Sequence, residues 1–263
     1  MQKPKAAAKR LFEAHERREQ FVPLPPELAP RDAEEAYAIQ DAFVAARAEC
    51  LGAIAGYKIA LSTPEMQRFV GVDKPQAGVM LASTLHRTPA RVRAADYGRL
   101  IVEFEIAVEM AADLPAADAP FTGERIAPFV RSVMPALELA DDRNADYREL
   151  AKHPLELIAD NAWNEGAVLG TPIEDWRGID LAAVRGVATI NGRVVGEGLG
   201  AAAMGHPLEA VAWIANHLAA QGRGLVYRDV VITGSLITTK TVRAGDVVRF
   251  SVTGLGDVEL HVV

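Results

Sequence analysis

Ile101-Val-Glu-Phe-Glu-Ile-Ala-Val-Glu-Met110 is a segment in which apolar and acidic side chains alternate. Side chains alternate between the two faces of a β-strand, so the pattern predicts a strand whose acidic face carries Glu103, Glu105 and Glu109. Carboxylates on one face, about 7 Å apart between Cα atoms, repel each other unless a cation or water separates them. The segment therefore indicates either a site for a hard divalent metal or an edge strand with a solvated face, and alone it favours neither.

The composition of the 263-residue chain is that of a globular soluble protein, with 50% hydrophobic and 24% charged residues. A formal net charge of -7 argues against nucleic acid or an anionic membrane surface as a partner, because both attract clustered positive charge. The single cysteine, Cys50, excludes an intramolecular disulfide and a thiolate-rich zinc site. With no signal-like segment and no run long enough to cross a bilayer, we expect a cytoplasmic protein that acts on small molecules.

Two helices are expected before the first strand. Residues 5–20 favour helix until the Pro-rich run of residues 22–30 stops it. Asp32 is then placed to cap a second helix that continues to about Arg47 and has apolar residues at helical spacing. We interpret this region as a packing layer rather than as part of a site.

A second strand is predicted at Gly56-Tyr-Lys-Ile-Ala-Leu61, where Lys58 shares a face with Gly56 and Ala60. Such small neighbours leave room for a ligand beside the lysine. The alternative is an ordinary strand lysine that reaches solvent. Thr63 or Ser62 then caps a short helix, and residues 72–78 are predicted to be a loop.

Two later segments carry isolated polar groups. Residues 134–142 predict another strand, in which Glu138 stands alone between alanines. Residues 157–170 crowd Asp160, Asn161 and other polar side chains between apolar runs, which indicates either a turn or the wall of a polar pocket.

The rest of the chain is largely β. Residues 187–195 predict a hairpin turning at Asn191-Gly192, and Pro207 starts a helix that Gly222 ends. Further strands are expected at residues 230–233, 247–252 and 258–263.

Several short motifs occur in a specific order along the chain. They are Gly56-Tyr-Lys58, Val102-Glu-Phe-Glu-Ile106, Pro135-Ala-Leu-Glu-Leu139, Ala159-Asp-Asn-Ala162, Gly205-His-Pro-Leu208, Ile232-Thr-Gly-Ser-Leu236 and Ala244-Gly-Asp246. Together they resemble the fumarylacetoacetate hydrolase superfamily, and most closely its branch of 2-keto-4-pentenoate hydratases and 4-oxalocrotonate decarboxylases. The resemblance runs from about residue 52 to the C-terminus, and the N-terminal helices match more loosely.

The resemblance implies an α+β fold, in which a mostly β roll or barrel carries the site and the N-terminal portion is helical. We expect residues 1–90 to form the helical portion, with the short strand of Lys58, and residues 91–263 to form the metal-binding β-roll, the two making one compact unit. Homo-oligomers are also implied. The implied roles are Mg²⁺ or Mn²⁺ binding by Glu103, Glu105 and Glu138, general acid/base catalysis by Lys58, and substrate binding by Asp160, Asn161, Gly234 and Ser235.

The activity implied is a hydratase of aromatic meta-cleavage that adds water to a 2-hydroxy-2,4-dienoate and gives a 4-hydroxy-2-oxo acid. A decarboxylase of a 2-oxo-3-enedioate is the alternative, with Lys240 or Arg68 as candidate partners for the departing carboxylate. An acylpyruvate hydrolase and a non-catalytic oxo-acid binder rank lower. A hydratase or decarboxylase of the same pathway is a possible protein partner.

Four residues depart from the family pattern. Gln76 stands where hydratases of this branch usually carry an acidic residue, so either water is activated elsewhere or the substrate differs. Trp163 and Glu165 replace small residues, which concerns the substrate's distal end. Lys240 adds a cation to the loop after Ser235. For Lys58 itself, burial and a neighbouring metal are expected to lower the pKa.

Overall fold

The acidic segment forms the middle of the larger of two β-sheets. It lies in β5 (Leu100–Met110), which pairs antiparallel with β6 (Val130–Asp141) over nearly its whole length. The computed structural model describes residues 2–263. The strand order of the larger sheet is β2-β1-β10-β5-β6-β7-β3, and β11 also pairs with β5. An edge position for the acidic strand is thereby excluded.

Strands from both predicted portions of the chain join this sheet. Its other strands are β1 (Ile54–Ala60), β2 (Gln76–Leu81), β3 (Leu85–Arg87), β7 (Asn164–Leu169), β10 (Val230–Ile232) and β11 (Lys240–Thr241). The smaller sheet has the order β4-β13-β12-β8-β9. Its strands are β4 (Ala90–Val92), β8 (Arg185–Ile190), β9 (Arg193–Leu199), β12 (Val247–Val252) and β13 (Gly256–Val262). The α+β class is confirmed, the β portion consists of two sheets, and a boundary near residue 90 stays a prediction.

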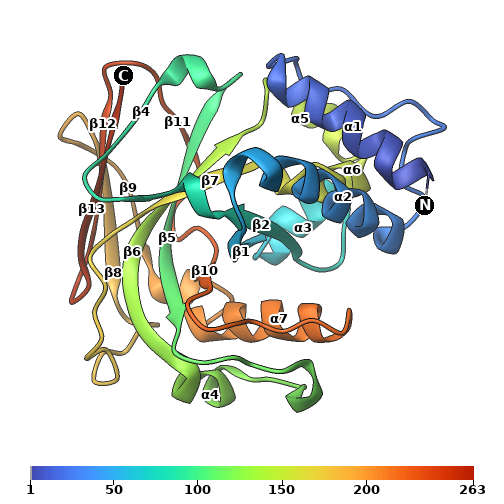
Figure 1. Ribbon diagram of the computed structural model, residues 1–263. Coiled ribbons are helices and arrows are strands. Elements are labelled where there is room, and N and C mark those ends of the chain that lie inside the picture. The colour runs from blue at the N-terminus through green and yellow to red at the C-terminus, as the bar shows by residue number, and fades with distance from the viewer. Residues whose placement is uncertain (1) are drawn as a thin grey trace.

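The two sheets meet through the apolar face of β5. Val102, Phe104, Ile106 and Val108 have no exposed surface. The ring of Phe104 packs edge to face on that of Phe250 from β12, with centroids 5.6 Å apart. Figure 1 shows β5 and β6 as long curved strands, with the smaller sheet on the side away from the N-terminal helices. The alternation predicted from the sequence therefore separates an interior face from a site face.

Helices gather at two places (Figure 1). Near the N-terminus lie α1 (Gln2–Glu16), α2 (Ala33–Leu51), α3 (Pro64–Val70), α5 (Tyr147–Leu150) and α6 (Pro154–Ala159). At the far end of β5 lie α4 (Gly123–Ile126) and α7 (Pro207–Ala219). The predicted caps are confirmed, because Asp32 accepts a hydrogen bond from the Glu35 N–H and Thr63 accepts one from the Met66 N–H.

Two segments predicted as loops are partly strands. The predicted loop of residues 72–78 ends inside β2, all six residues of which are buried beside β1. Pro75 and Gly78 suggested a loop, but Gly78 is needed for close packing across the strands. Residues 157–170 contain the end of α6, a short turn and then β7. The hairpin at Asn191-Gly192 is confirmed, with φ values of 52° and 75°.

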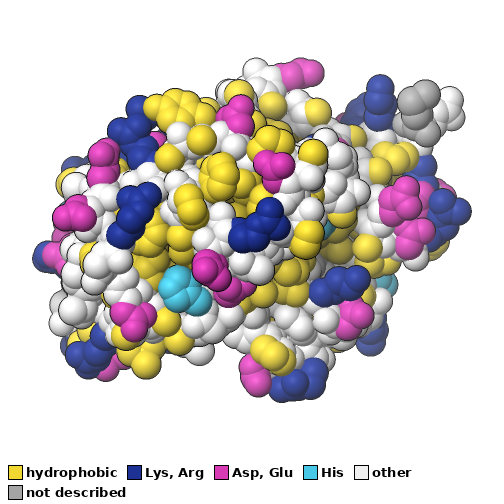
Figure 2. Space-filling view, turned by 90° about the horizontal axis from the view of Figure 1, so that it is seen from below, with side chains coloured by type: hydrophobic (Ala, Val, Ile, Leu, Met, Phe, Trp, Pro, Cys, Tyr) yellow, Lys and Arg dark blue, Asp and Glu magenta, His cyan; other side chains and the backbone are white. Residues whose placement is uncertain are grey.

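The surface carries charges of both signs. Figure 2 shows Lys and Arg side chains interspersed with Asp and Glu on the face viewed, without a patch of a single sign. Within residues 2–263, none of the helices has both the length and the apolar character that crossing a bilayer requires.

We expect Phe250→Ala to lower the free energy of unfolding by about 3–5 kcal/mol, because removing a fully buried ring leaves a cavity between the sheets. Urea unfolding followed by circular dichroism measures the change. Val194→Ala is the control, because Val194 is 60% exposed on β9 and its truncation should cost less than about 0.5 kcal/mol. Similar losses in the two variants would contradict a supporting role for the Phe250 ring.

Candidate metal centre and active site

Three carboxylates converge on the site face of the β5/β6 pair. Glu103 and Glu138 are directly opposite each other in the strand register, and Glu105 follows on the same face. Each of the three offers an oxygen, and these oxygens all lie within 4.8 Å of one another. Glu105 and Glu138 are completely buried, whereas Glu103 is partly exposed. The solvated-face alternative is therefore wrong.

The carboxylates keep oxygens that no protein group satisfies. Oε2 of Glu105 accepts a hydrogen bond from the Gly234 N–H at 2.6 Å, and Oε1 of Glu138 accepts one from Nδ2 of Asn164 at 2.9 Å. Glu105 Oε1 and Glu138 Oε2 are buried without a partner. Burial and the neighbouring negative charges raise the pKa of Glu105 well above its usual value. Burial raises the pKa of Glu138 to about 6, against the opposing charge of Lys58. This oxygen-rich, electron-donating set fits a hard divalent cation.

Lys58 reaches the carboxylates from β1. Its Nζ lies 3.0 Å from Oε1 of Glu138, and the residue is only 3% exposed, which excludes an ordinary solvent-facing lysine. Gly78 on β2 makes this path possible, because a Cβ there would lie 2.8 Å from Cγ of Lys58. Burial tends to lower the pKa of Lys58, but the charges of Glu138, Glu103 and Glu105 outweigh it and raise the pKa. The pKa of Lys58 was expected to be lowered, but the three carboxylates by themselves raise it.

Gly234 and Ser235 lie beside the carboxylates. The Ser235 hydroxyl lines the cavity, accepts a hydrogen bond from the Phe104 N–H at 2.9 Å and donates one to the Ile237 carbonyl at 2.7 Å. The Thr239 hydroxyl donates to Oε1 of Glu103 at 3.0 Å. Sequence reasoning missed Thr239, because nothing in its local pattern marks a contact with a residue on a distant strand.

Asp160 and Asn161 make contacts with protein groups and do not line the cavity. The Asn161 amide bonds to both the N–H and the carbonyl of Val79, at 2.7 and 2.9 Å. Asp160 bonds to His15 at 2.7 Å and pairs with Arg143. Substrate binding by Asp160 and Asn161 stays a prediction, and the contacts seen hold the chain segment that follows them.

That segment is a left-handed turn. Asn161, Ala162 and Trp163 have φ values of 53°, 48° and 59°, a conformation that costs about 1–2 kcal/mol per residue without glycine. Ala162 and Trp163 line the cavity. The bonds of Asp160 and Asn161 therefore hold two cavity-lining residues in an otherwise unfavourable backbone conformation.

A buried ionic network joins this turn to the N-terminal helices. His15 Nδ1 on α1 lies 3.1 Å from Oε1 of Glu165, and Arg47 on α2 donates to the same oxygen at 2.9 Å. Arg47 and His15, whose attraction overcomes the effect of burial, lower the pKa of Glu165 to about 2. Glu165 was noted as a departure from the family pattern, but its partners were missed because they lie over a hundred residues away.

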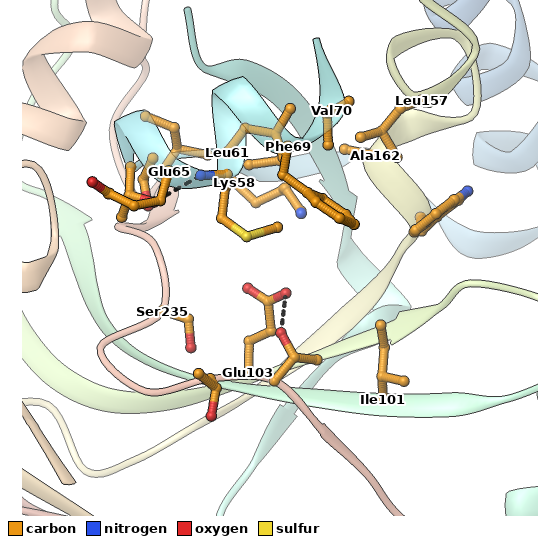
Figure 3. Close-up of a pocket in the computed structure, with 18 of the residues that line it drawn as sticks. Lys58, Leu61, Glu65, Phe69, Val70, Ile101, Glu103, Leu157, Ala162 and Ser235 are labelled. Atoms are coloured by element: carbon orange, nitrogen blue, oxygen red, sulfur yellow. Dashed lines mark hydrogen bonds between the residues drawn. The ribbon is translucent and has the colours of Figure 1, made fainter. Parts of the chain in front are cut away.

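Lys58 and Glu103 line a cavity of about 490 Å³, and Glu105 and Glu138 adjoin them without lining it. In Figure 3, Lys58 and Glu103 approach from opposite walls, with Ser235 at the side of Glu103. Gln76 does not line the cavity, and its Nε2 donates to the Pro154 carbonyl at 3.3 Å. Arg68 pairs with Glu65 on the surface and Lys240 bonds to Thr238, so neither candidate cation of the decarboxylase alternative lines the cavity.

Mg²⁺ should raise the melting temperature of the wild type, because a ligand that binds only the folded state stabilises it, by about 2.7 kcal/mol at a hundredfold excess over Kd. Glu105→Gln should remove most of this shift and stabilise the metal-free protein, since a buried carboxylate with an unpaired oxygen is costly. Differential scanning calorimetry with and without Mg²⁺ measures both effects.

Glu109→Gln is the matched control for this test. Glu109 is on the same strand and face, but it contacts Ser132 at 3.2 Å and Arg228 at 3.6 Å instead of the cluster. This variant should keep the Mg²⁺ shift. Identical responses of the wild type and Glu105→Gln would remove Glu105 from the metal ligands.

His15 should stabilise the fold more at acidic than at basic pH. Burial opposes its charge, but Asp160 and Glu165 raise its pKa above 6.5, so its contribution is full below 6.5 and is lost as the pH rises through the folded value. The stability gap between wild type and His15→Gln should therefore be larger at about pH 5.5 than at about pH 8.5, as measured by urea unfolding.

His217→Gln is the comparison of opposite sign, because burial lowers the pKa of His217 to about 4 in the folded state while the unfolded side chain titrates near its usual 6.5. His217 should therefore cost the wild type stability at about pH 5.5 relative to about pH 8.5, so its gap to His217→Gln should shift in the direction opposite to that of His15→Gln. A gap for His15→Gln that does not change between the two pH values would show that His15 does not carry a proton in the folded network.

Known proteins resemble the chain over most of its length. The family model described as fumarylacetoacetate (FAA) hydrolase C-terminal matches residues 57–263. A 2-keto-4-pentenoate hydratase of Paraburkholderia phymatum is 32% identical over 251 residues, covering 95% of this chain and 94% of the relative. A 2-hydroxyhexa-2,4-dienoate hydratase of Comamonas testosteroni is 31% identical over 249 residues, covering 94% and 92%.

A solved structure shares the whole fold. The 4-oxalocrotonate decarboxylase from Pseudomonas putida G7, complexed with magnesium and adipate, has a TM-score of 0.90 and 25% identity, covering 100% of this chain and 98% of that one. The same enzyme complexed with calcium and acetate has a TM-score of 0.89. The family model covers the strands that carry Lys58 and the three carboxylates, and relatives above 30% identity cover nearly the entire chain. The chain therefore belongs to the fumarylacetoacetate hydrolase family.

Proposed function

We propose that the chain is a divalent-metal-dependent hydratase that adds water to a 2-hydroxy-2,4-dienoate to give a 4-hydroxy-2-oxo acid. The observation that carries the proposal is the cluster of Glu103, Glu105 and Glu138, two of them completely buried, with Lys58 Nζ 3.0 Å from Glu138. Glu103 and Lys58 line the adjoining cavity. The names of the relatives, 2-keto-4-pentenoate hydratase and 2-hydroxyhexa-2,4-dienoate hydratase, support the same chemistry.

The three carboxylates and Lys58 have different roles in the proposed reaction. Glu103, Glu105 and Glu138 would hold the cation, which when bound supplies a positive centre for the oxygens of a 2-oxo acid and favours its enolate form. Lys58, kept protonated by the three carboxylates, is placed to deliver a proton to the distal carbon of the dienol while the enol loses its own. Water then adds across the conjugated double bond, with its hydroxyl on C4 and its hydrogen on C3.

Decarboxylation of an enedioate is the second candidate, supported by the likeness to the solved 4-oxalocrotonate decarboxylase. That substrate carries a second carboxylate. Among the described residues that line the cavity, Lys58 is the one cation, and it stands with the metal cluster. The cavity therefore favours the hydratase over the decarboxylase.

Other features are proposed with the activity. Mg²⁺ or Mn²⁺ is the expected cation, and the likeness to a magnesium complex supports the first. Gly234 and Ser235 are proposed as substrate-binding residues because they adjoin the carboxylates. We further propose a cytoplasmic homo-oligomer of the meta-cleavage pathway, with a pathway decarboxylase or hydratase as a partner.

Turnover is tested with 2-hydroxypenta-2,4-dienoate, whose ultraviolet absorbance falls as the dienol is consumed. We expect Mg²⁺-dependent decay in the wild type and a decrease in kcat of about a hundredfold or more for Lys58→Met, because the proton donor is lost. Lys58→Met should keep a Mg²⁺-induced rise in melting temperature, which separates loss of catalysis from loss of metal.

Lys152→Met is the matched control, because Lys152 is exposed and pairs with Glu149 away from the cavity. It should retain wild-type turnover. If the wild type does not consume the dienoate with Mg²⁺ or with Mn²⁺, the hydratase assignment is wrong. If Lys58→Met keeps full turnover, Lys58 has no part in proton transfer.

A further inference from the structure

The cavity extends past the carboxylates into an apolar region that the reaction at the metal does not use. We call this region the distal pocket, and its walls are formed by Val70, Ile101, Leu150, Leu157, Ala162 and Trp163. All six belong to one packed apolar cluster, separate from the core between the sheets. In Figure 3, Ile101, Leu157 and Ala162 lie on the side of Glu103 away from Ser235.

The cavity is larger than a five-carbon dienoate requires. That molecule has eight non-hydrogen atoms, and at roughly 30 Å³ or less for each, the share of one liquid water, it fills no more than about half of the space. The whole cavity measures about 490 Å³. With the carboxylate end of the substrate at the metal cluster, part of the cavity stays empty, and the distal pocket is the part of that space on the side of Glu103 away from Ser235.

The six wall residues of the distal pocket are apolar and present carbon surfaces. The Tyr147 hydroxyl at its edge already donates to Asp142 at 2.7 Å, and Nε1 of Trp163 has no partner but is buried and not exposed to the cavity. Glu65, which also lines the cavity, is exposed and paired with Arg68, so it is not one of the distal pocket's walls. A second carboxylate would lose its hydration in this pocket without gaining a cation.

The walls are fixed before any substrate enters. Trp163 packs edge to face on Phe21 and on Tyr147, with centroid distances of 5.4 and 5.9 Å. Its left-handed backbone is held by the bonds of Asp160 and Asn161 described above. A preformed apolar pocket gains affinity from each methylene it receives, because little ordering is left to be done on binding.

We propose that the distal pocket selects 2-hydroxydienoates whose carbon remote from the carboxylate carries an uncharged alkyl or aryl group larger than methyl. This specificity rests on the proposed hydratase function. Its residues are Ile101, Leu150, Leu157 and Trp163, which would contact the substituent and not the reacting atoms.

The first test measures kcat/KM for the unsubstituted dienoate and for its methyl, propyl and carboxyl derivatives at the remote carbon. We expect a rise of roughly fourfold per buried methylene and the lowest value for the carboxyl derivative. Leu157→Trp should lower the ratio of kcat/KM for the propyl derivative to kcat/KM for the unsubstituted dienoate by roughly tenfold or more, because the larger ring fills the pocket. Leu155→Trp is the matched control on the same helix, since Leu155 does not line the cavity.

A binding test separates this inference from the hydratase function. Calorimetry on the Mg²⁺-loaded wild type compares pyruvate, 2-oxooctanoate and 2-oxoadipate, none of which needs to react. Tighter binding of 2-oxooctanoate than of the other two supports the pocket even if no dienoate is turned over, in which case only the hydratase function fails. If the unsubstituted dienoate is the best substrate, or 2-oxooctanoate binds no better than pyruvate, the proposed specificity is overturned.

Discussion

The clustering of three like charges, two of them completely buried, is the constraint on which the rest of the structure depends. Glu103, Glu105 and Glu138 lie on paired strands inside the larger sheet, where desolvation and mutual repulsion both act against them. Each neighbouring element contributes a compensating group: β1 brings Lys58, β7 brings Asn164, and the segment after β10 brings the Gly234 N–H. The oxygens left over after these bonds are the ones available to a cation.

The local part of this arrangement could be predicted from the sequence, and the long-range part could not. The alternation at residues 101–110 is a property of neighbouring residues, so it was enough to predict the strand and its acidic face. The position of Glu138 opposite Glu103 depends on the register between two strands, which no single segment determines. Only the resemblance to a family linked the two. For β2, local signals misled, because Pro75 and Gly78 are typical of loops while the strand is held by its burial against β1.

In the candidate site, too, local features could be predicted from the sequence and long-range contacts could not. Residues 157–170 were recognised as unusual because their polar residues interrupt apolar runs, but the function of each side chain depends on partners elsewhere. Asp160 and Glu165 are neutralised by His15, Arg47 and Arg143, which lie on α1, on α2 and in the segment after β6. The N-terminal helices, interpreted from sequence as a packing layer, thus also position the wall of the cavity. No spacing rule connects residues so distant.

The strand order has a consequence for synthesis on the ribosome. β10, at residues 230–232, is inserted between β1 and β5 and hydrogen-bonds to both. Until that segment has left the exit tunnel, the strand of Lys58 has no neighbour on one side and β5 presents an open edge next to its buried carboxylates. The sheet can therefore close only after residues 230–232 have emerged, and an unpaired apolar edge of this kind invites aggregation.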